Sequence, residues 1–405
     1  MMDQGSKAGP LSGLRVLEMG QLVAGPFCSR ILADFGAEVI KIELPGQGDA
    51  LRVWRTMLEE TNTSLWWYVQ SRNKKSITLN LNHPEAGEVV RQLVKQVDIL
   101  VENFKPGKLE EWGLGWEELH RLNPKLILTR ISGWGQDGPY RDKASYGSIG
   151  ESMGGLRYIT GFPDRPPVRP SISLGDSLSG MWGAIGTLTA VVNRVANGGE
   201  GQVVDVALNE AVFAMLESMI TEYDKLGIVR ERAGTAMPGI APVNTYRCKD
   251  GAYAVIAGNG DGVFKRMMNA MGHPEMANDP RFADNAGRVK HNDLLDSVMA
   301  EWASQHSFEE ASQILSAVDV PVGPIYSIAD IAADPHFQAR EMIVECESPE
   351  TGPLKEPGIV PKLSATPGEI KWIGPRLGEH NREIYGGLLG LSDEQLQEWA
   401  TNGLI

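Results

Sequence analysis

The sequence predicts an α/β protein with a doubly wound parallel sheet and a second, smaller α+β domain. Short apolar runs alternate with amphipathic helical segments over residues 14–132, which is the order that βαβ units produce. From about residue 234 the chain becomes richer in Pro and Gly, and a hairpin pattern begins. The chain has 405 residues, of which 42% are hydrophobic and 22% charged, so it can bury more than one core.

The first βαβ unit is expected within residues 14–44. Its strands are expected at LRVLEM and AEVIKIE, and its helix at PFCSRILADFG, which ends at Gly36. The alternation continues through SITLNL, a helix over 84–97, DILVENF, a helix near 108–122 and LILTRIS. One face of the helix over 84–97 carries apolar residues at helical spacing, namely Val90, Leu93, Val94 and Val97. We expect this face to lie on the sheet.

Further elements follow the Gly-rich loop GWGQDGPY. The pattern predicts an apolar helix over about 177–197, a strand at QVVDVAL and a helix from 208 to about 226. A hairpin at TYRCKDGAYAVIAG, turning at Lys249-Asp250-Gly251, opens the small domain, whose helices continue to about 318. A last helix begins after Ser392, where Gln395 is placed to complete a capping box.

These elements predict three parts of the chain. Residues 1–225 form a large Rossmann-like domain, residues 226–325 form the small domain with its linkers, and residues 326–405 return to the large domain.

Charge and cysteine content exclude several classes of protein. The 38 Lys and Arg residues against 52 Asp and Glu residues give a net charge of −14, which argues against an extended nucleic-acid surface but allows one anionic small molecule. Cys28, Cys248 and Cys346 are far apart and predict neither a disulfide framework nor a zinc site, so no metal is expected. The charged N-terminus and the lack of an apolar run of ~18 residues predict a cytoplasmic protein without a membrane span.

The first βα turn argues against a dinucleotide-dependent dehydrogenase. It reads GQLVAGP where a dinucleotide-binding turn needs GxGxxG, so Glu43 is better explained as a solvated residue at a strand end than as a ribose ligand. The chain also has no P-loop, no GxSxG elbow and no HExxH helix.

Asp176 is the most informative acidic residue. It follows a glycine and comes before a long helix of small residues with no charge until Arg194, so its carboxylate is expected at a helix N-terminus in apolar surroundings. An ionised and poorly hydrated carboxylate is a usable nucleophile toward an activated acyl group. Asp is also a preferred helix cap, and the spacing alone does not separate these two interpretations.

Nine segments, spread over almost the whole chain, carry a further pattern. In order they are LSGLRVLEMGQLVAGPFCSRILADFGAEVIKIE, GQGDALRVW, NKKSITLNL, VENFKPG, ISGWGQDGP, LGDSLSGMWGAIG, GQVVDVAL, VPVGPIYSIADIAADPHF and LGEHN. Together they resemble the family III CoA-transferases, which include formyl-CoA and carnitine CoA-transferases.

The resemblance implies a mechanism in which Asp176, in LGDS, attacks an acyl-CoA thioester. An aspartyl anhydride and then an aspartyl-CoA thioester would form before the acceptor acid is acylated, and acyl transfer of this kind requires no metal or redox cofactor. Backbone amides would stabilise the developing oxyanion, and the glycines within residues 257–262 are candidate donors. The resemblance also implies a homodimer whose subunits interlock like chain links.

The same resemblance implies a set of positions that bind coenzyme A, the acyl carrier of the substrate. They are Val23, Ala24, Leu79, Asn103, Phe104, Lys105, Lys143 and Tyr146. Val23 and Ala24 would bring backbone groups of the first βα turn close to CoA, and Lys105 would serve its phosphates.

The chain departs from the formyl-CoA transferases in three places. Leu44 and Glu111 stand where those enzymes have arginines, so the contacts to the CoA phosphates must differ. The long glycine loop ahead of the small domain is also missing, so the resemblance does not extend to oxalate and formate as substrates.

The region AMPGIAPVNTYRCKDGAYAVIAGNGDGVF resembles the branch of the family that uses succinyl-CoA and other dicarboxylates. A second carboxylate on the substrate would require a cationic partner. Five arginines are candidates for that role, each with a surface ion pair as its alternative: Arg52, Arg55, Arg72, Arg141 and Arg169.

Two other functions remain as alternatives. The α-methylacyl-CoA racemases of the same superfamily pair an aspartate at the Asp176 position with an upstream histidine, but the segment KASYGSIG has Tyr146 there, so one of two bases is missing. A non-catalytic CoA-binding protein is the other alternative. The sequence does not identify the donor acid, the acceptor acid or the pathway.

Overall fold

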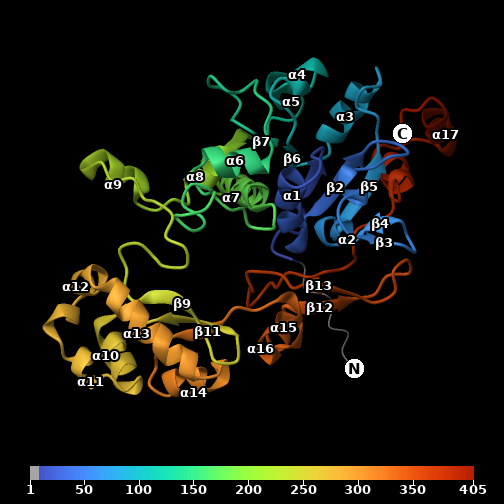
Figure 1. Cartoon of the computed structure of the whole chain (residues 1–405). Helices are drawn as coiled ribbons and strands as arrows, with labels where there is room; N and C mark the ends of the chain where they lie inside the picture. The colour runs from blue at the N-terminus through green and yellow to red at the C-terminus, as the bar shows by residue number, and fades with distance from the viewer. Residues whose placement is uncertain (1–8) are drawn as a thin grey trace. The chain divides into compact units, whose positions relative to one another are not determined.

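The structure is a computed structural model, and it describes residues 9–405. These residues divide into two compact units, drawn with the whole chain in Figure 1. The first unit contains the chain up to Leu156 together with Pro170–Glu217 and Ala339–Ile405. The second contains Arg157–Arg169 and Ser218–Gln338. The sequence-based division differs from this one in three places. It keeps residues 157–169 and 218–225 within the large domain, and it assigns residues 326–338 to the segment that returns to the large domain.

A six-stranded sheet forms the centre of the first unit. Its spatial order is β5 (Lys74–Thr78), β2 (Glu38–Glu43), β1 (Arg15–Glu18), β6 (Ile99–Glu102), β7 (Ile127–Ser132) and β8 (Val203–Ala207). All five neighbouring pairs are parallel, which confirms the predicted parallel α/β sheet. The chain winds outward from β1 in both directions, so the turns that follow β1 and β6 flank the switch point, where open α/β sheets bind ligands.

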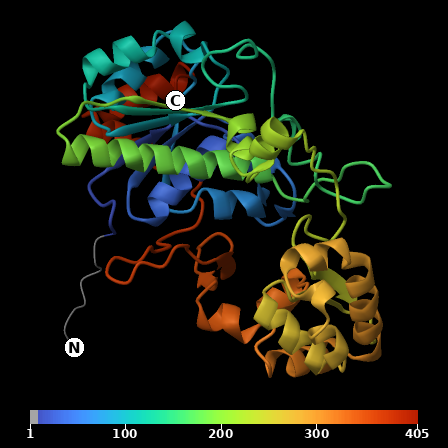
Figure 2. The ribbon, with the colours of Figure 1, turned by 90° about the vertical axis from the view of Figure 1, so that its left-hand side faces the viewer.

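Helices cover both faces of this sheet. The helices of the first unit are α1 (Ala24–Asp34), α2 (Leu65–Gln70), α3 (Ala86–Val94), α4 (Lys108–Glu111), α5 (Trp116–Leu122), α6 (Gly147–Met153), α7 (Leu174–Ala196), α8 (Leu208–Phe213) and α17 (Asp393–Thr401), with a 3-10 turn at Ala50–Val53 and a π-helix at Arg382–Leu388. Figure 2 shows the long α7 on one side of the sheet with α1, and α3, α4 and α5 on the other side.

Two buried clusters match these two faces. One joins α1, α7 and α8 to inward residues such as Val16 and Ile99. The other joins α3 and the C-terminal segment to residues such as Leu17 and Leu100. All four residues of the predicted apolar face are at most 4% exposed, as the helical spacing requires, although α3 spans Ala86–Val94 and Val97 follows its end.

Three more predicted helices differ from the observed ones. The segment near 108–122 forms two short helices, α4 and α5, because Gly113 between them has a φ of +69°. The segment 208–226 also divides, into α8 and α9 (Met219–Leu226), and Glu217 between them has a φ of +51°. Helix α7 begins at Leu174, three residues earlier than expected.

The second unit has its own small antiparallel sheet. Its strands, in spatial order, are β11 (Val322–Pro324), β10 (Tyr253–Ala257) and β9 (Val243–Arg247). The predicted hairpin is confirmed, since Gly251 takes a φ of +86° and donates its N–H to the carbonyl of Cys248 over 3.0 Å. The helices of this unit, with one 3-10 turn at Pro280–Phe282, are α9, α10 (Asp261–Ala270), α11 (Pro274–Ala277), α12 (Asn285–Lys290), α13 (Asn292–Gln305), α14 (Phe308–Ser316), α15 (Ile328–Ala333) and α16 (Pro335–Ala339).

The C-terminal segment packs on the first unit. The hydroxyl of the buried Tyr385 donates to the carbonyl of Thr78 at the end of β5 over 2.8 Å. The capping box predicted for the last helix is present, with Ser392 and Gln395 bonded reciprocally. Two hairpins complete the unit, β3 (Met57–Leu58) with β4 (Thr63–Ser64) and β12 (Ile343–Cys346) with β13 (Leu354–Pro357). Within residues 9–405, no helix has both the length and the apolar character that crossing a bilayer requires.

Candidate active site

The turns after β1 and β6 are tied together by one side chain. The Asn103 amide accepts the N–H of Gln21 over 2.8 Å and donates to the carbonyl of Gln21 over 2.9 Å. Gly20 and Gly25 allow this close approach, because a Cβ atom on either would stand 2.8 or 3.2 Å from Oδ1 of Asn103. Asn103 therefore shapes the first βα turn.

Asp49 also holds the first βα turn in place. Its two carboxylate oxygens lie 3.0 and 3.1 Å from the N–H of Leu22, a residue with a φ of +64°. The carboxylate also accepts the N–H of Leu51 over 2.9 Å and lies 2.8 Å from the Lys41 ammonium. Since Leu22 adopts a conformation that favours glycine, these bonds hold the turn just ahead of Val23 in an otherwise unfavourable shape.

A buried charge network supports Asp49. The Glu18 carboxylate lies 2.8 Å from both Lys41 and Lys74, and these three side chains are at most 1% exposed. Burial alone would raise the pKa of Glu18, but the two ammonium groups outweigh it and lower the pKa to about 2. Burial lowers the pKa of Lys74 to about 8, although Glu18 opposes this change.

Helix α7 lies directly on α1, and the two helices meet through small residues. A Cβ atom on Gly180 would come within 2.7 Å of the carbonyl of Ala24, and one on Gly183 within 3.2 Å of the sulfur of Cys28. Gly180 is one turn beyond Asp176. The contact therefore brings the first turns of α7 to the beginning of α1, beside Val23 and Ala24.

Asp176 is the third residue of α7 and is half-buried. Helix α7 is capped at Ser173, so the interpretation of Asp176 as the cap residue is wrong, while its expected position at the helix N-terminus is confirmed. The side chain faces α6, where a Cβ atom on Gly147 would overlap Oδ2 of Asp176. Glycine at position 147 is what leaves room for the carboxylate.

Glu151 is a second acidic residue beside Asp176. Its side chain is fully buried, and its Oε1 accepts the N–H of Gly175 over 3.2 Å. A Cβ atom on Gly175 would stand 2.7 Å from the carbonyl of Gly147, so α6 and α7 touch backbone to backbone at this point. Glu151 thereby holds the residue that precedes Asp176.

The other predicted CoA-binding residues lie in different environments. Phe104 packs edge-on against Trp112 at 5.1 Å between ring centroids, and Leu79 is 1% exposed within the core. The Leu79 side chain is therefore closed to a ligand, whereas the Phe104 ring is only partly buried. Lys105 is exposed just after β6.

Lys143 and Tyr146 lie on the segment that leads into α6. The Lys143 ammonium lies 3.7 Å from the ring centroid of Tyr140. Tyr146 is 69% exposed and directly precedes Gly147. Both side chains are therefore exposed on the surface.

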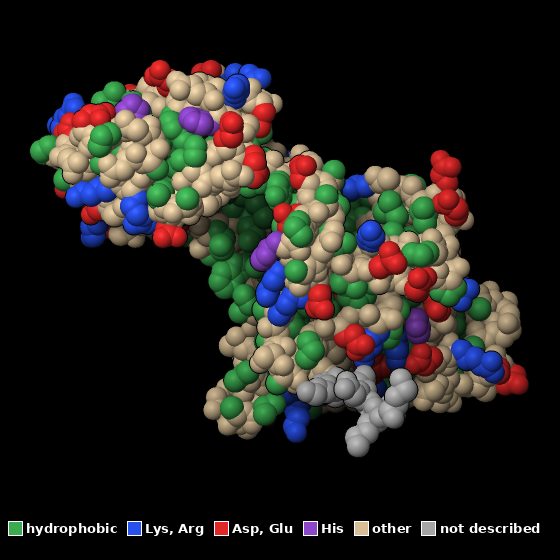
Figure 3. Space-filling model, turned by 90° about the horizontal axis from the view of Figure 1, so that it is seen from below, with side chains coloured by type: hydrophobic (Ala, Val, Ile, Leu, Met, Phe, Trp, Pro, Cys, Tyr) green, Lys and Arg blue, Asp and Glu red, His purple; other side chains and the backbone are tan. Residues whose placement is uncertain are grey.

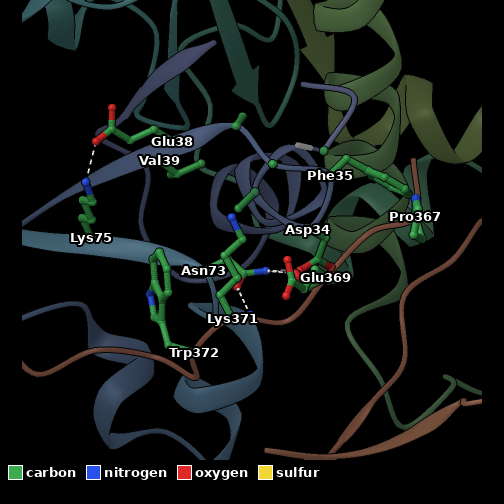
Figure 4. Close-up of a pocket in the computed structure, with 14 residues that line it drawn as sticks. Asp34, Phe35, Glu38, Val39, Asn73, Lys75, Pro367, Glu369, Lys371 and Trp372 are labelled. Carbon is green, nitrogen blue, oxygen red and sulfur yellow. Dashed lines mark hydrogen bonds and ion pairs between the residues drawn. The ribbon is translucent and has the colours of Figure 1, made fainter. Parts of the chain in front are cut away.

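The cavity drawn in Figure 4 lies at the other edge of the sheet. It has a volume of about 200 Å³ and is lined by the starts of β2 and β5 and the end of α1. Two of its lining side chains bond to acidic residues of the same lining. The Lys75 ammonium binds Glu38 over 2.5 Å, and the Asn73 amide donates to Asp34 over 3.3 Å. This cavity is distant from the carboxyl edge that carries the candidate site.

Surface charge agrees with the composition. On the face seen in Figure 3, the Lys and Arg side chains lie among Asp and Glu side chains rather than forming one basic surface. The described residues also contain no cluster of His, Cys, Asp and Glu side chains suited to hold a metal ion.

The sequence and the fold together identify the class of protein. The family model of CoA-transferase family III matches residues 11–381, and the chain belongs to this family. It is an enzyme of that family, and the predicted resemblance is confirmed.

Two named CoA-transferases and one crystal structure are similar to this chain. The chain is 52% identical to the succinyl-CoA–D-citramalate CoA-transferase of Chloroflexus aurantiacus, over 96% of each chain. It is 35% identical to the succinate–glutarate CoA-transferase of Agrobacterium fabrum, over 96% of this chain and 98% of the relative. A crystal structure of a CAIB/BAIF family protein from Brucella suis matches with a TM-score of 0.82 and 34% identity, covering 94% of this chain and 100% of that one.

The sequence reasoning missed the residues that shape the site. Glu18, Lys41, Asp49 and Lys74 were not identified because their roles depend on strands that are distant in the sequence. Among these four residues, only Asp49 lies in a segment that the sequence singled out, GQGDALRVW. Glu151 had no signal beyond its place four residues after Gly147, where one helical turn puts it on the same face.

Proposed function

We propose that the protein transfers CoA from succinyl-CoA to a second carboxylic acid, with Asp176 as the nucleophile. The observation that carries this proposal is the position of Asp176 in the first turn of α7, against Gly147 and one turn from the contact with Ala24. Succinyl-CoA as donor is supported by the relative that is 52% identical and is named for succinyl-CoA and D-citramalate.

The proposed transfer of CoA consists of four acyl-transfer steps. An oxygen of Asp176 attacks the thioester carbonyl, a C–O bond forms, and the C–S bond breaks to release CoA thiolate. The thiolate then attacks the Asp176 carbonyl carbon and displaces succinate, which leaves an aspartyl-CoA thioester. The acceptor carboxylate attacks this thioester and releases the thiolate, which finally attacks the acceptor's acyl carbon and frees Asp176.

The first turn of α7 suits this role. Peptide dipoles and free N–H groups at a helix N-terminus stabilise the carboxylate form, and the buried surroundings limit its hydration. Backbone N–H groups near the reacting carbonyl would stabilise the oxyanion. The glycines within residues 257–262, which the sequence offered as donors, belong to the second unit and stay a prediction from the sequence.

CoA is proposed to bind across the switch point between β1 and β6. The Val23–Ala24 turn and the Asn103–Lys105 turn meet there, joined by the bonds between Asn103 and Gln21. Lys105 and Lys143 supply exposed positive charge for the phosphates, and Tyr146 flanks the acyl end. Leu79 contributes through its backbone, since its side chain belongs to the core, and Phe104 contributes through its partly buried ring.

We propose that the functional form is an interlocked homodimer. Helix α7 exposes a row of large apolar side chains: Met181, Trp182, Ile185, Val192 and Val195, which are 38–76% exposed. Beside it, the open edge of β8 borders a groove of about 540 Å³. Exposed apolar faces and open strand edges of this extent mark sites of association.

A cytoplasmic location is proposed as well, and the free thiols of the three cysteines support it.

A substrate panel tests the proposed reaction. The protein is incubated with succinyl-CoA and one of several acids, including D-citramalate and glutarate, and the CoA esters are resolved by chromatography. Formation of a new CoA ester with stoichiometric succinate supports the proposal. Deuterium uptake at the α-carbon without exchange of CoA would support a racemase, and CoA binding with neither reaction would support a binding protein.

A further inference from the structure

Two arginines stack on two adjacent tryptophans near the candidate site. The Arg52 guanidinium lies 3.7 Å from the ring centroid of Trp67, and the Arg55 guanidinium lies 4.0 Å from that of Trp66. Arg52 is 9% exposed and donates two hydrogen bonds to the Glu43 carboxylate, over 2.7 and 2.8 Å. Arg55 is exposed and forms no ion pair with any carboxylate among residues 9–405.

The backbone of Arg55 is held in an unusual conformation. Its φ of +65° is rare for a residue with a side chain. The hairpin that follows fixes it, since the N–H of Leu65 donates to the carbonyl of Thr56 over 2.9 Å and the Ser64 hydroxyl donates to the carbonyl of Trp54 over 2.5 Å. The backbone on both sides of Arg55 is therefore held by hydrogen bonds.

Arg55 points toward the start of α7. Its Nη2 donates to Oγ of Ser173, the cap residue of that helix, over 3.4 Å. Ser173 and Asp176 are three residues apart, which is about 4.5 Å along a helix axis. A four-carbon dicarboxylyl chain bridges such a span, so one of its ends can reach Asp176 while the other meets the guanidinium.

We propose that Arg55 binds the distal carboxylate of a dicarboxylyl substrate while the other end of that substrate acylates Asp176. This inference rests on the proposed function and adds the group that selects dicarboxylates. A guanidinium held over an aromatic ring still has N–H groups to offer, and this planar fork can bind a carboxylate through two hydrogen bonds.

The other arginines considered are less suited. Arg52 is already paired with Glu43, and Arg72 is fully buried between Asp34 and Glu356. Arg141 lies within 3.8 Å of Asp142. Arg169 already interacts with another group of the protein.

The test compares two donors that differ only at the distal end, succinyl-CoA and butyryl-CoA. The kcat/KM for the donor reports the half-reaction up to acyl transfer, so the acceptor does not affect the comparison. Arg55→Gln is expected to lower kcat/KM for succinyl-CoA by about 10- to 100-fold, the loss of charge-assisted hydrogen bonds, and to leave that for butyryl-CoA within about threefold. Arg55→Lys keeps the positive charge but not the two-pronged guanidinium. Its loss of kcat/KM for succinyl-CoA is therefore expected to be smaller than that of Arg55→Gln.

Arg121→Gln is the matched control, since Arg121 is an exposed arginine in a surface pair with Glu118 on α5. Its ratio of the two kcat/KM values should equal that of the wild type. If Arg55→Gln lowers kcat/KM equally for both donors, Arg55 acts only on the position of α7, and the inference is overturned. If Arg55→Gln leaves both kcat/KM values unchanged, the inference is overturned as well. If the wild-type enzyme transfers CoA from neither donor, the proposed function itself fails instead.

Discussion

Gly147 lies so close to Asp176 that a Cβ atom on the glycine would overlap Oδ2 of the carboxylate. The two residues are 29 positions apart in the chain, and the contact exists because α6 and α7 meet backbone to backbone at Gly147 and Gly175. The position of the proposed nucleophile therefore depends on the absence of a side chain in a different helix.

Gly147→Ala should displace the Asp176 carboxylate and lower kcat by about 100-fold, since a misplacement of ~1 Å can reduce a rate by that factor. The added methyl group cannot share space with Oδ2, so the carboxylate must move. Steady-state kinetics with the preferred acid measures the effect. Gly387→Ala is the control, because nothing lies within 4 Å of the Cβ that it adds. Wild-type kcat in Gly147→Ala would show that this contact does not position the nucleophile.

Glu18 gives a prediction for the dependence of stability on pH. Its pKa is lowered from 4.5 to about 2 in the folded protein, so its stabilising contribution is complete above pH 4.5 and is lost as the pH falls toward 2. The full contribution is about 3 kcal/mol, and about 1 kcal/mol of it is lost by pH 3.5. Urea denaturation of the wild type and of Glu18→Gln at pH 6 and pH 3.5 measures this.

The difference in unfolding free energy between the two proteins should shrink by about 1 kcal/mol at the lower pH. Glu111→Gln is the control, because Glu111 forms an exposed pair with Lys108. A difference for Glu18→Gln that stays the same at both pH values would mean that Glu18 is not the group whose protonation weakens the fold.

The exposed row on α7 gives a prediction for the oligomeric state. Ile185 is 50% exposed and Val195 is 76% exposed on that helix. Replacing both with Glu places charges where an apolar interface would form, so the sedimentation mass should fall from that of a dimer to that of a monomer. Ile328→Glu, at an 81% exposed position on α15, should leave the mass unchanged. A wild-type protein that sediments as a monomer would contradict the proposed dimer.

Local patterns predicted much of the fold. The apolar spacing of α3 identified its buried face, Gly251 identified the hairpin turn, and Ser392 identified the last helix. Each of these signals depends on residues within one turn or one hairpin, where propensity and periodicity act directly. The segment 157–169 gave no such signal, and its membership in the second unit became visible only in the structure.

The candidate site was predictable in part. Asp176 was identified from its glycine neighbour and the helix after it, together with the resemblance, but its environment depends on Gly147 and Glu151 of α6. Asn103 was expected as a CoA contact, whereas both polar ends of its side chain bind the backbone of Gln21, 82 residues away. Contacts of this kind come from the order of the strands in the sheet, which a single sequence does not state.

Chemical trapping of Asp176 tests the central claim most directly. The enzyme is mixed with succinyl-CoA, quenched with hydroxylamine during turnover, digested and mapped by mass spectrometry. The account predicts a hydroxamate at Asp176 and at no other carboxylate, with both the label and the transfer of CoA lost in a folded Asp176→Ala variant. A label on a different carboxylate, or full turnover by Asp176→Ala, would contradict it.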